Sequence, residues 1–291
     1  MDHMRVLRPA PGVYAFYDGR VDGYRFAEEP NWVDEGAISL GIASYAIVSE
    51  AQAIVYDTHV SVPHGRRIRE TLEAEGAREF TVILSHWHLD HIAGTEAFED
   101  CEVISSERTA ELLAANQAGI EAGELEGPPG IDPLVLPTRT YADRFELSLG
   151  SIPLQLIHTD IHSDDATVIW MPEQGILLCG DTMEDTVTYV DEPGSLETHL
   201  DNLAELRTLD AERILPNHGD PEVIAAGGYP IELIAATERY LEILRRSRSE
   251  PELRQMGLRE LLAEDLEGGA IHYFPPYEAV HSENLEQMLS G

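Results

Sequence analysis

Six consecutive residues of this chain carry four side chains of the kinds that bind metal ions. They are His86, His88, Asp90 and His91, in the order His-x-His-x-Asp-His. At this chain's histidine and aspartate frequencies, chance gives such a run in about one of a thousand similar sequences. Side chains alternate between the two faces of an extended chain, so we expect the first three to project to one side and His91 to join them as the chain turns. Imidazole and carboxylate together favour zinc, with iron or manganese as rivals.

A short apolar segment at residues 80–84 leads directly into this motif and has the composition of a buried strand. Residues 65–76 before it carry apolar side chains at helical spacing. Further upstream the sequence predicts strands at 13–17, 38–48 and 53–56, the last of which stops at Asp57. Sheets of α/β proteins place their ligands at the carboxyl ends of strands, so the motif stands where chemistry is expected.

The second half of the chain repeats this arrangement. The predicted elements are strands at 145–149, 152–157, 167–170, 176–178 and 214–215, and a helix at 196–209. A loop rich in glycine and proline at 119–137 separates the halves and is placed to cover the site. From residue 231 onward the pattern is helical and acidic.

The charge of the chain excludes several classes of function. Nineteen basic residues stand against 54 acidic ones among 291, a formal net charge of −35. Such a charge repels nucleic acid and anionic membrane surfaces. All the basic residues are arginines, which excludes Schiff-base chemistry and the lysine-containing phosphate loop. We therefore expect a small-molecule substrate, with no nucleic-acid or membrane partner.

The expected compartment is the cytoplasm. The two cysteines, Cys101 and Cys179, are too few for a disulfide framework. No apolar run reaches the roughly 18 residues that a membrane helix needs, and the N-terminus lacks the apolar stretch of a signal peptide. A homodimer is one possible assembly that the sequence leaves open.

Further residues complete a pattern that resembles the metallo-β-lactamase superfamily. The run from His86 to His91, after a strand and before Ile92-Ala93-Gly94, is similar to the metal motif of that superfamily. The other parts of its pattern are matched by Asp57 at a strand end, His162 before Ser163, Asp181 after Gly180, and His218 before Gly219. The match spans residues 57–219, most of the chain.

The resemblance implies an α/β fold, a four-layer αββα sandwich with a C-terminal helical extension. Residues 1–228 would form the catalytic domain, and residues 229–291 the helical extension packed on it. Two halves of strands that end in ligand-type residues agree with this architecture.

The resemblance also implies a centre of two metal ions, two Zn²⁺ with iron or manganese as alternatives. The implied ligands are His86, His88 and His162 for one ion and Asp90, His91 and His218 for the other, with Asp181 bridging them and Asp57 supporting a ligand by a hydrogen bond. Two metals that share a carboxylate and a water lower the pKa of that water toward ~7. The expected activity is hydrolysis of a small ester, lactone or thioester by the resulting hydroxide.

Two positions that differ from other members of the superfamily indicate which of its branches this chain resembles. Asp181 stands where the common zinc β-lactamases place a cysteine, and His88 stands where flavodiiron oxygen reductases place a glutamate. The pattern therefore resembles the glyoxalase II and lactonase branches more closely. In homoserine-lactone hydrolases a tyrosine soon after the bridging aspartate serves the substrate carbonyl, which makes Tyr189 the candidate. The predicted catalytic residues are thus Asp90, Asp181 and Tyr189.

Two other functions stay open: a phosphodiesterase or nuclease of the same superfamily, and a non-catalytic or redox di-iron protein. Among single residues, His158 is an alternative to His162 as a ligand, and His281 lies in a segment able to fold back over the site. Trp87 is expected to pack against its neighbours. Arg245, Arg246 and Arg248 are expected at a solvated helix end that is able to bind an anionic substrate tail.

Overall fold

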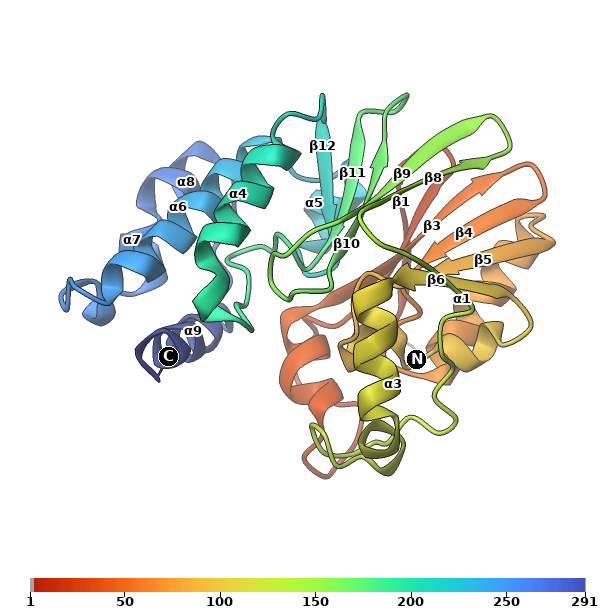
Figure 1. The fold of residues 1–291 in the computed structure, drawn as a ribbon, viewed down its shortest axis with the longest axis horizontal. Helices are drawn as coiled ribbons and strands as arrows, with labels where there is room; N and C mark the ends of the chain where they lie inside the picture. Colours follow the sequence, from red (N-terminus) through yellow and green to blue (C-terminus); the bar gives the residue numbers. More distant parts are fainter. Residues whose placement is uncertain (1–2, 291) are drawn as a thin grey trace.

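Two β-sheets packed face to face form the centre of the protein in the computed structural model, which describes residues 3–290 (Figure 1). The first sheet has seven strands in chain order: β1 (Arg5–Ala10), β2 (Val13–Asp18), β3 (Ile42–Ser49), β4 (Gln52–Tyr56), β5 (Glu79–Ile83), β6 (Glu102–Ser106) and β7 (Arg139–Tyr141). The pairs from β1 to β4 are antiparallel and those from β4 to β7 are parallel.

The second sheet has five strands in the order β12-β11-β10-β9-β8. Their bounds are β8 (Arg144–Leu149), β9 (Ile152–His158), β10 (Thr167–Met171), β11 (Ile176–Gly180) and β12 (Arg213–Pro216). β12 is parallel to β11, and two antiparallel pairings make β9 run the same way as β11. The carboxyl ends of β9, β11 and β12 therefore meet at one edge.

Alternation of side chains along the strands explains the layers. On β2, Val13, Ala15 and Tyr17 join the core between the sheets, whereas Tyr14 and Phe16 join a second core on the outer face of the seven-stranded sheet. All five are buried. Because both faces of this strand are covered, its residues form an apolar run without polar alternation.

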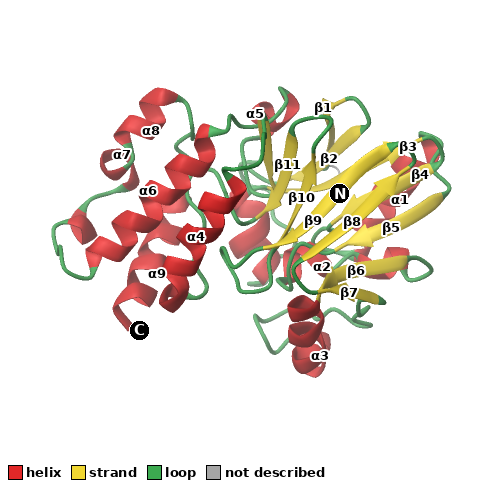
Figure 2. Cartoon of the chain, turned by 45° about the horizontal axis from the view of Figure 1, so that its top comes forward, coloured by secondary structure: helices red, strands yellow, loops and turns green. Residues whose placement is uncertain are grey.

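Helices cover both outer faces (Figure 2). α1 (Val62–Ala74) and α3 (Glu107–Ala122) bury apolar residues in the outer core of the seven-stranded sheet, near the short α2 (Leu89–Ile92), η1 (Val33–Ile38) and η2 (Thr95–Phe98). On the other side lie α4 (Leu196–Leu206), α5 (Pro221–Ala225), α6 (Glu232–Ser247), α7 (Leu258–Leu261), α8 (Ala263–Gly268) and α9 (Tyr277–Ser290), with η3 (Pro193–Ser195) and η4 (Leu253–Gln255). The four-layer αββα sandwich with a helical C-terminal part is confirmed.

Several local expectations need correction. The strand expected from residue 38 begins at Ile42, because residues 33–38 form a π-helical turn. The expected loop at 119–137 begins late, because α3 continues to Ala122 and ends at Gly123 with a left-handed backbone. Strands β1, β6 and β7 and helix α3 were not expected; β7 is three residues long, too short for a periodic signal.

The C-terminal part packs on the second sheet. Apolar residues of α6 and α9, such as Leu241 and Met288, belong to the same core as Leu178 of β11. The boundary expected after residue 228 falls between α5 and α6, and the division into two domains there stays a prediction. Among residues 3–290, no helix is long and apolar enough to cross a membrane.

The glycine that follows the metal motif generates a test of the fold. A Cβ at Gly94 would overlap the carbonyl oxygen of Thr58, whereas a Cβ at Gly119 on α3 meets nothing within 4 Å. We expect Gly94→Ala to lower the free energy of unfolding by about 1–3 kcal/mol because backbone must move. Gly119→Ala, the matched control, should raise it by roughly 0.5–1 kcal/mol. Urea unfolding measures both; a Gly94→Ala protein as stable as the parent contradicts the close approach.

Candidate metal centre

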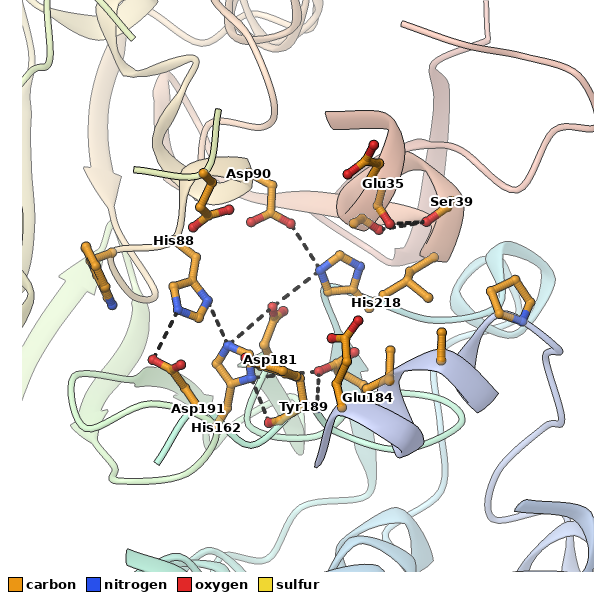
Figure 3. A pocket seen from close by; sticks show the side chains of 18 of the residues that line it. Glu35, Ser39, His88, Asp90, His162, Asp181, Glu184, Tyr189, Asp191 and His218 are labelled. Atoms are coloured by element: carbon orange, nitrogen blue, oxygen red, sulfur yellow. Dashed lines mark hydrogen bonds and ion pairs between the residues drawn. The ribbon is translucent and has the colours of Figure 1, made fainter. Parts of the chain in front are cut away.

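Loops at the carboxyl ends of five strands bring the predicted ligands together. Asp57 follows β4, residues 85–91 follow β5, His162 follows β9, Asp181 follows β11, and His218 follows β12. Figure 3 shows five of these side chains pointing toward one another across a common space: His88, Asp90, His162, Asp181 and His218. All seven predicted ligands lie in overlapping groups whose ligand atoms are within 4.8 Å of one another.

The Asp181 carboxylate lies at the centre of this group. Its Oδ2 is 3.1 Å from His91 Nε2 and 3.3 Å from His218 Nε2. The same oxygen is 3.8 Å from His86 Nε2 and 3.9 Å from His162 Nε2. A carboxylate that faces histidines of both implied ligand sets occupies the position expected of a bridge.

The sequence suggested that the motif is extended from His86 to Asp90, but the structure shows that its second half is helical. His88 stands at the N-cap position of α2 without a capping hydrogen bond from its side chain, and Asp90 and His91 lie in the single turn of this helix. The helical turn places Asp90 Oδ1 3.4 Å from His91 Nε2 and Asp90 Oδ2 3.3 Å from His218 Nε2. The side chains converge as predicted. However, the start of a helix brings Asp90 inward, and not the alternation of side chains along a strand.

The third histidine of the other set is His162. Its Nε2 lies 3.0 Å from His88 Nδ1, and its ring makes edge contacts with His86 and His88. His158, the alternative, ends β9, and its Nε2 lies 2.9 Å from the carbonyl oxygen of Asp164. The structure thus places His162 in the group and His158 outside it.

Each of the four buried histidines of this group has a partner on its other ring nitrogen, which fixes the ring. His91 Nδ1 lies 2.9 Å from Asp57 Oδ2, and His86 Nδ1 lies 2.8 Å from Ser85 Oγ. The remaining two face backbone carbonyl oxygens, His218 Nδ1 that of Gly41 at 2.8 Å and His162 Nδ1 that of Tyr189 at 3.0 Å. Such partners orient the inward nitrogens as metal ligands require.

Two buried atoms of the group have no hydrogen-bond partner in the described part of the chain, His86 Nε2 and Asp181 Oδ1. Leaving a buried polar atom unpaired costs about 1–3 kcal/mol, so native proteins rarely do so without a bound group. The donor set of imidazoles and carboxylates suits divalent transition metals. These residues therefore fit the metal ions that the sequence pattern implies, and their roles as ligands stay a prediction.

The electrostatics of the group are those of a cation site. Burial opposes charge throughout, yet the charges of His218 and His91 hold the pKa of Asp181 well below its usual range and that of Asp90 at about 2. In return, Asp181 raises the pKa values of both histidines. Without a comparable excess of carboxylate neighbours, burial lowers the pKa of His86. The carboxylates are thus held ionised in a buried place that favours positive charge.

A cavity of about 570 Å³ opens onto this group. Its apolar walls come from Trp87, Leu40 and, on α9, Ala279 and Val280. Trp87 thus lies beside the site and not only in packing. The other lining residues include the carboxylates Glu35, Asp90, Glu126, Asp181, Glu184, Asp191 and Glu283, and none of the described residues lining it is an arginine. The cavity is therefore strongly acidic.

Three polar residues at the site were missed by the sequence analysis. Glu184 is buried, and its Oε1 accepts from the backbone N–H of Tyr189 at 3.0 Å. Burial and the charge of Asp181 raise the pKa of Glu184 to about 7. Asp191 Oδ2 lies 3.8 Å from His88 Nε2, and Asn217 donates to Asp57. Only Asn217 had a local signal, its place directly before the predicted ligand His218.

Of the remaining candidate residues, Tyr189 lies at the site, whereas His281 and the arginine group do not line the cavity. The Tyr189 ring contacts His162 at a centroid distance of 5.8 Å, and its hydroxyl lies 2.5 Å from the amide of Gln287. Its catalytic role stays a prediction. His281 is buried against Tyr240 and is not among the cavity residues, although its helix does fold over the cavity. The arginine group of α6 lies elsewhere, with Arg246 paired to Glu250.

A two-sheet sandwich whose histidines and aspartates converge at strand ends defines a class of metal-binding α/β proteins. The profile of the Metallo-beta-lactamase superfamily matches residues 39–218, more than half of the chain. The chain belongs to the metallo-β-lactamase superfamily. The family predicted from the sequence is confirmed, and its members are metal-dependent hydrolases.

Relatives and solved structures agree at low identity. A Beta-lactamase-like protein 2 homolog of Caenorhabditis elegans is 24% identical over 62% of this chain and 56% of its own length, so the chain spans little over half of that relative. A Hydroxyacylglutathione hydrolase of Methylococcus capsulatus is 28% identical over 50% of each chain. A metallo-beta-lactamase structure from Pontibacter korlensis superposes with a TM-score of 0.62 at 18% identity, covering 82% of this chain and 99% of that one. This likeness shows the fold.

The Asp57 carboxylate gives a test of how the centre is supported. Asp57→Asn removes the charge that faces His91 Nδ1 while keeping the size of the side chain. We expect metal affinity to fall about 10- to 100-fold, as is usual for a lost partner of a ligand histidine. Competition with a chromogenic chelator measures it. Asp132→Asn, at an exposed site, is the control and should bind as the parent does; equal affinity in both variants would sink the supporting role.

Proposed function

We propose that this protein is a hydrolase with a centre of two divalent ions, two Zn²⁺ in the first place, that cleaves a small carboxylic ester or lactone. The observation that carries the proposal is the group of seven converging ligand side chains, with two unpartnered buried atoms, at the base of the cavity. Fold and family support hydrolysis as the general class of reaction.

Two divalent ions held by His86, His88 and His162 and by Asp90, His91 and His218, with Asp181 between, would acidify a shared water and polarise a carbonyl oxygen. Asp90, whose side chain is 17% exposed, lies at the border of the cavity. From there its carboxylate would orient the attacking water and take its proton. As the water oxygen bonded to the carbonyl carbon and the bond to the alkoxy oxygen broke, Asp90 would return the proton to that oxygen.

The walls of the cavity determine how the substrate binds. Trp87, Leu40 and Val280 offer apolar surface for an acyl chain, and α9 excludes water on that side. The carboxylates Glu35, Glu126 and Glu283 lie at exposed positions of the lining. This arrangement favours a neutral or cationic substrate over one with anionic groups.

The acidic lining distinguishes two classes of substrate: thioesters of anionic carriers, and neutral lactones or esters. The names of two relatives, the Hydroxyacylglutathione hydrolase and an Acyl-coenzyme A thioesterase of Gallus gallus that is 28% identical over 39% of this chain, specify thioesters of anionic carriers. Glutathione has two carboxylates and coenzyme A has phosphates, and arginine or lysine usually binds such groups. A lining without arginine supports the neutral lactone or ester instead.

Removal of a ligand tests the proposal directly. With Zn²⁺-loaded protein in a pH-stat, we expect proton release from an N-acyl homoserine lactone or a simple ester to stop on addition of chelator. Asp181→Ala and His162→Ala should each lose more than a hundredfold in rate, beyond the roughly 10- to 100-fold typical of supporting residues. His158→Ala is the matched control, since His158 lies outside the group, and should stay active.

Full activity of either ligand variant would overturn the proposal. Faster turnover of bis-p-nitrophenyl phosphate than of any carboxylic ester would move the protein to the phosphodiesterases. Iron in the purified protein with reversible oxygen uptake would instead support the redox alternative.

The acidic cavity predicts charge selectivity. We expect kcat/KM for a neutral lactone to exceed that for S-lactoylglutathione, and the ratio to fall about fivefold or more at low ionic strength in the double variant Glu126→Gln/Glu283→Gln. Glu197→Gln, on an exposed part of α4 away from the cavity lining, is the control and should leave the ratio unchanged. A parent enzyme that prefers the glutathione thioester refutes the charge argument.

A further inference from the structure

A second group of metal-binding side chains lies outside the cavity and shares no residue with the centre described above. Asp160, Glu192 and His199 each offer one ligand atom, and the three atoms lie within 4.8 Å of one another. They come from three separate segments: the loop between β9 and β10, the loop before η3, and the first turn of α4.

His199 is the side chain that distinguishes this group from an ordinary acidic cluster. It is fully buried, and neither of its ring nitrogens has a hydrogen-bond partner in residues 3–290. Asp160 Oδ1 and Glu192 Oε2 are likewise buried atoms without a partner. His199 Nδ1 and Glu192 Oε2 have neither a hydrogen bond nor an ion pair within residues 3–290, and native proteins rarely leave buried polar atoms so without a bound group.

The geometry between His199 and Asp160 agrees with an ion bound between them. His199 Nε2 lies only 3.2 Å from Asp160 Oδ1, within hydrogen-bond distance. The two atoms are close enough for an ion pair, but they do not meet the geometry of a hydrogen bond. Two ligand-type atoms at this distance can share a bound ion.

The surrounding charge favours a cation. Burial and the neighbouring carboxylates Asp164 and Asp160 raise the pKa of Glu192 to about 7. Arg108 neutralises Asp164 through an ion pair of 2.8 Å, so it leaves the charge of Asp160 and Glu192 in place. A divalent cation would compensate that charge.

We propose that Asp160, Glu192 and His199 form a further binding site for a divalent transition metal, separate from the two-metal centre. One imidazole and two carboxylates suit Zn²⁺ or Mn²⁺ better than Ca²⁺ or Mg²⁺, which prefer oxygen ligands only. Three protein ligands leave a fourth position for water.

Such an ion would stabilise two loops beside the metal centre, those that carry His162 and Asp191. Asp160 is two residues before His162, and Glu192 follows Asp191, whose backbone N–H donates to the carbonyl oxygen of His162 at 2.9 Å. Binding of one ion to both segments and to α4 would hold that pair of loops together. Its role is therefore structural.

Metal stoichiometry tests the site without reference to activity. Full-length protein is stripped with chelator, reloaded with Zn²⁺ or, separately, Mn²⁺, desalted and analysed for metal per chain. We expect Glu192→Gln and His199→Gln to bind one ion fewer than the parent. Glu197→Gln removes an exposed carboxylate from the same helix, and this control should bind as many ions as the parent.

A second measurement protects the test against a variant that does not fold. Glu192 is only half-buried, so Glu192→Gln is expected to fold, and circular dichroism checks this. Saturating Zn²⁺ should raise the melting temperature of the parent more than that of Glu192→Gln. Equal stoichiometry and an equal rise in folded parent and variant overturn the site. Because the readout is bound metal, the result is independent of whether the protein hydrolyses esters.

Discussion

The contacts of the buried Asp57 carboxylate hold the centre of this protein together. Oδ1 accepts from the backbone N–H of Ser85, and Oδ2 faces both the Asn217 amide and His91 Nδ1. These partners lie at the ends of β5 and β12 and in α2, so one side chain at the end of β4 joins both sheets. A fully buried charge is tolerated only with such a set of partners. The positions of the ligand loops therefore depend on this residue.

A second constraint is the concentration of negative charge. The chain has a net charge of −35, and much of the cavity lining is carboxylate. In the interior, histidines hold Asp90 and Asp181 ionised, and at the border Glu35, Glu126 and Glu283 face solvent. Divalent cations are the natural counter-charge for such an arrangement. Under the proposed function, the same charge would disfavour substrates with anionic groups, so metal binding and selectivity would share one physical origin.

The C-terminal helix α9 contributes both to the cavity wall and to the support of a loop beside the metal centre. α9 supplies one wall, and its Asn284 side chain fixes the loop that carries Tyr189, accepting from the N–H of Val190 at 2.9 Å and donating to the carbonyl of Thr188 at 3.0 Å. That loop in turn offers the Tyr189 carbonyl to His162. A segment far from the motifs in sequence thus orients a predicted ligand.

The sequence by itself determined the kind of centre and the class of fold. The motif from His86 to His91, with Asp181 and His218, was readable because each part is local: a predicted ligand within a few residues of the end of an apolar strand. Only the tertiary structure decided between His158 and His162. A left-handed backbone at His162 turns its side chain into the group, and no sequence period encodes that turn. Glu184, Asp191 and the group around His199 gain their surroundings from segments that meet only when sheets and helices pack, so no local pattern announces them.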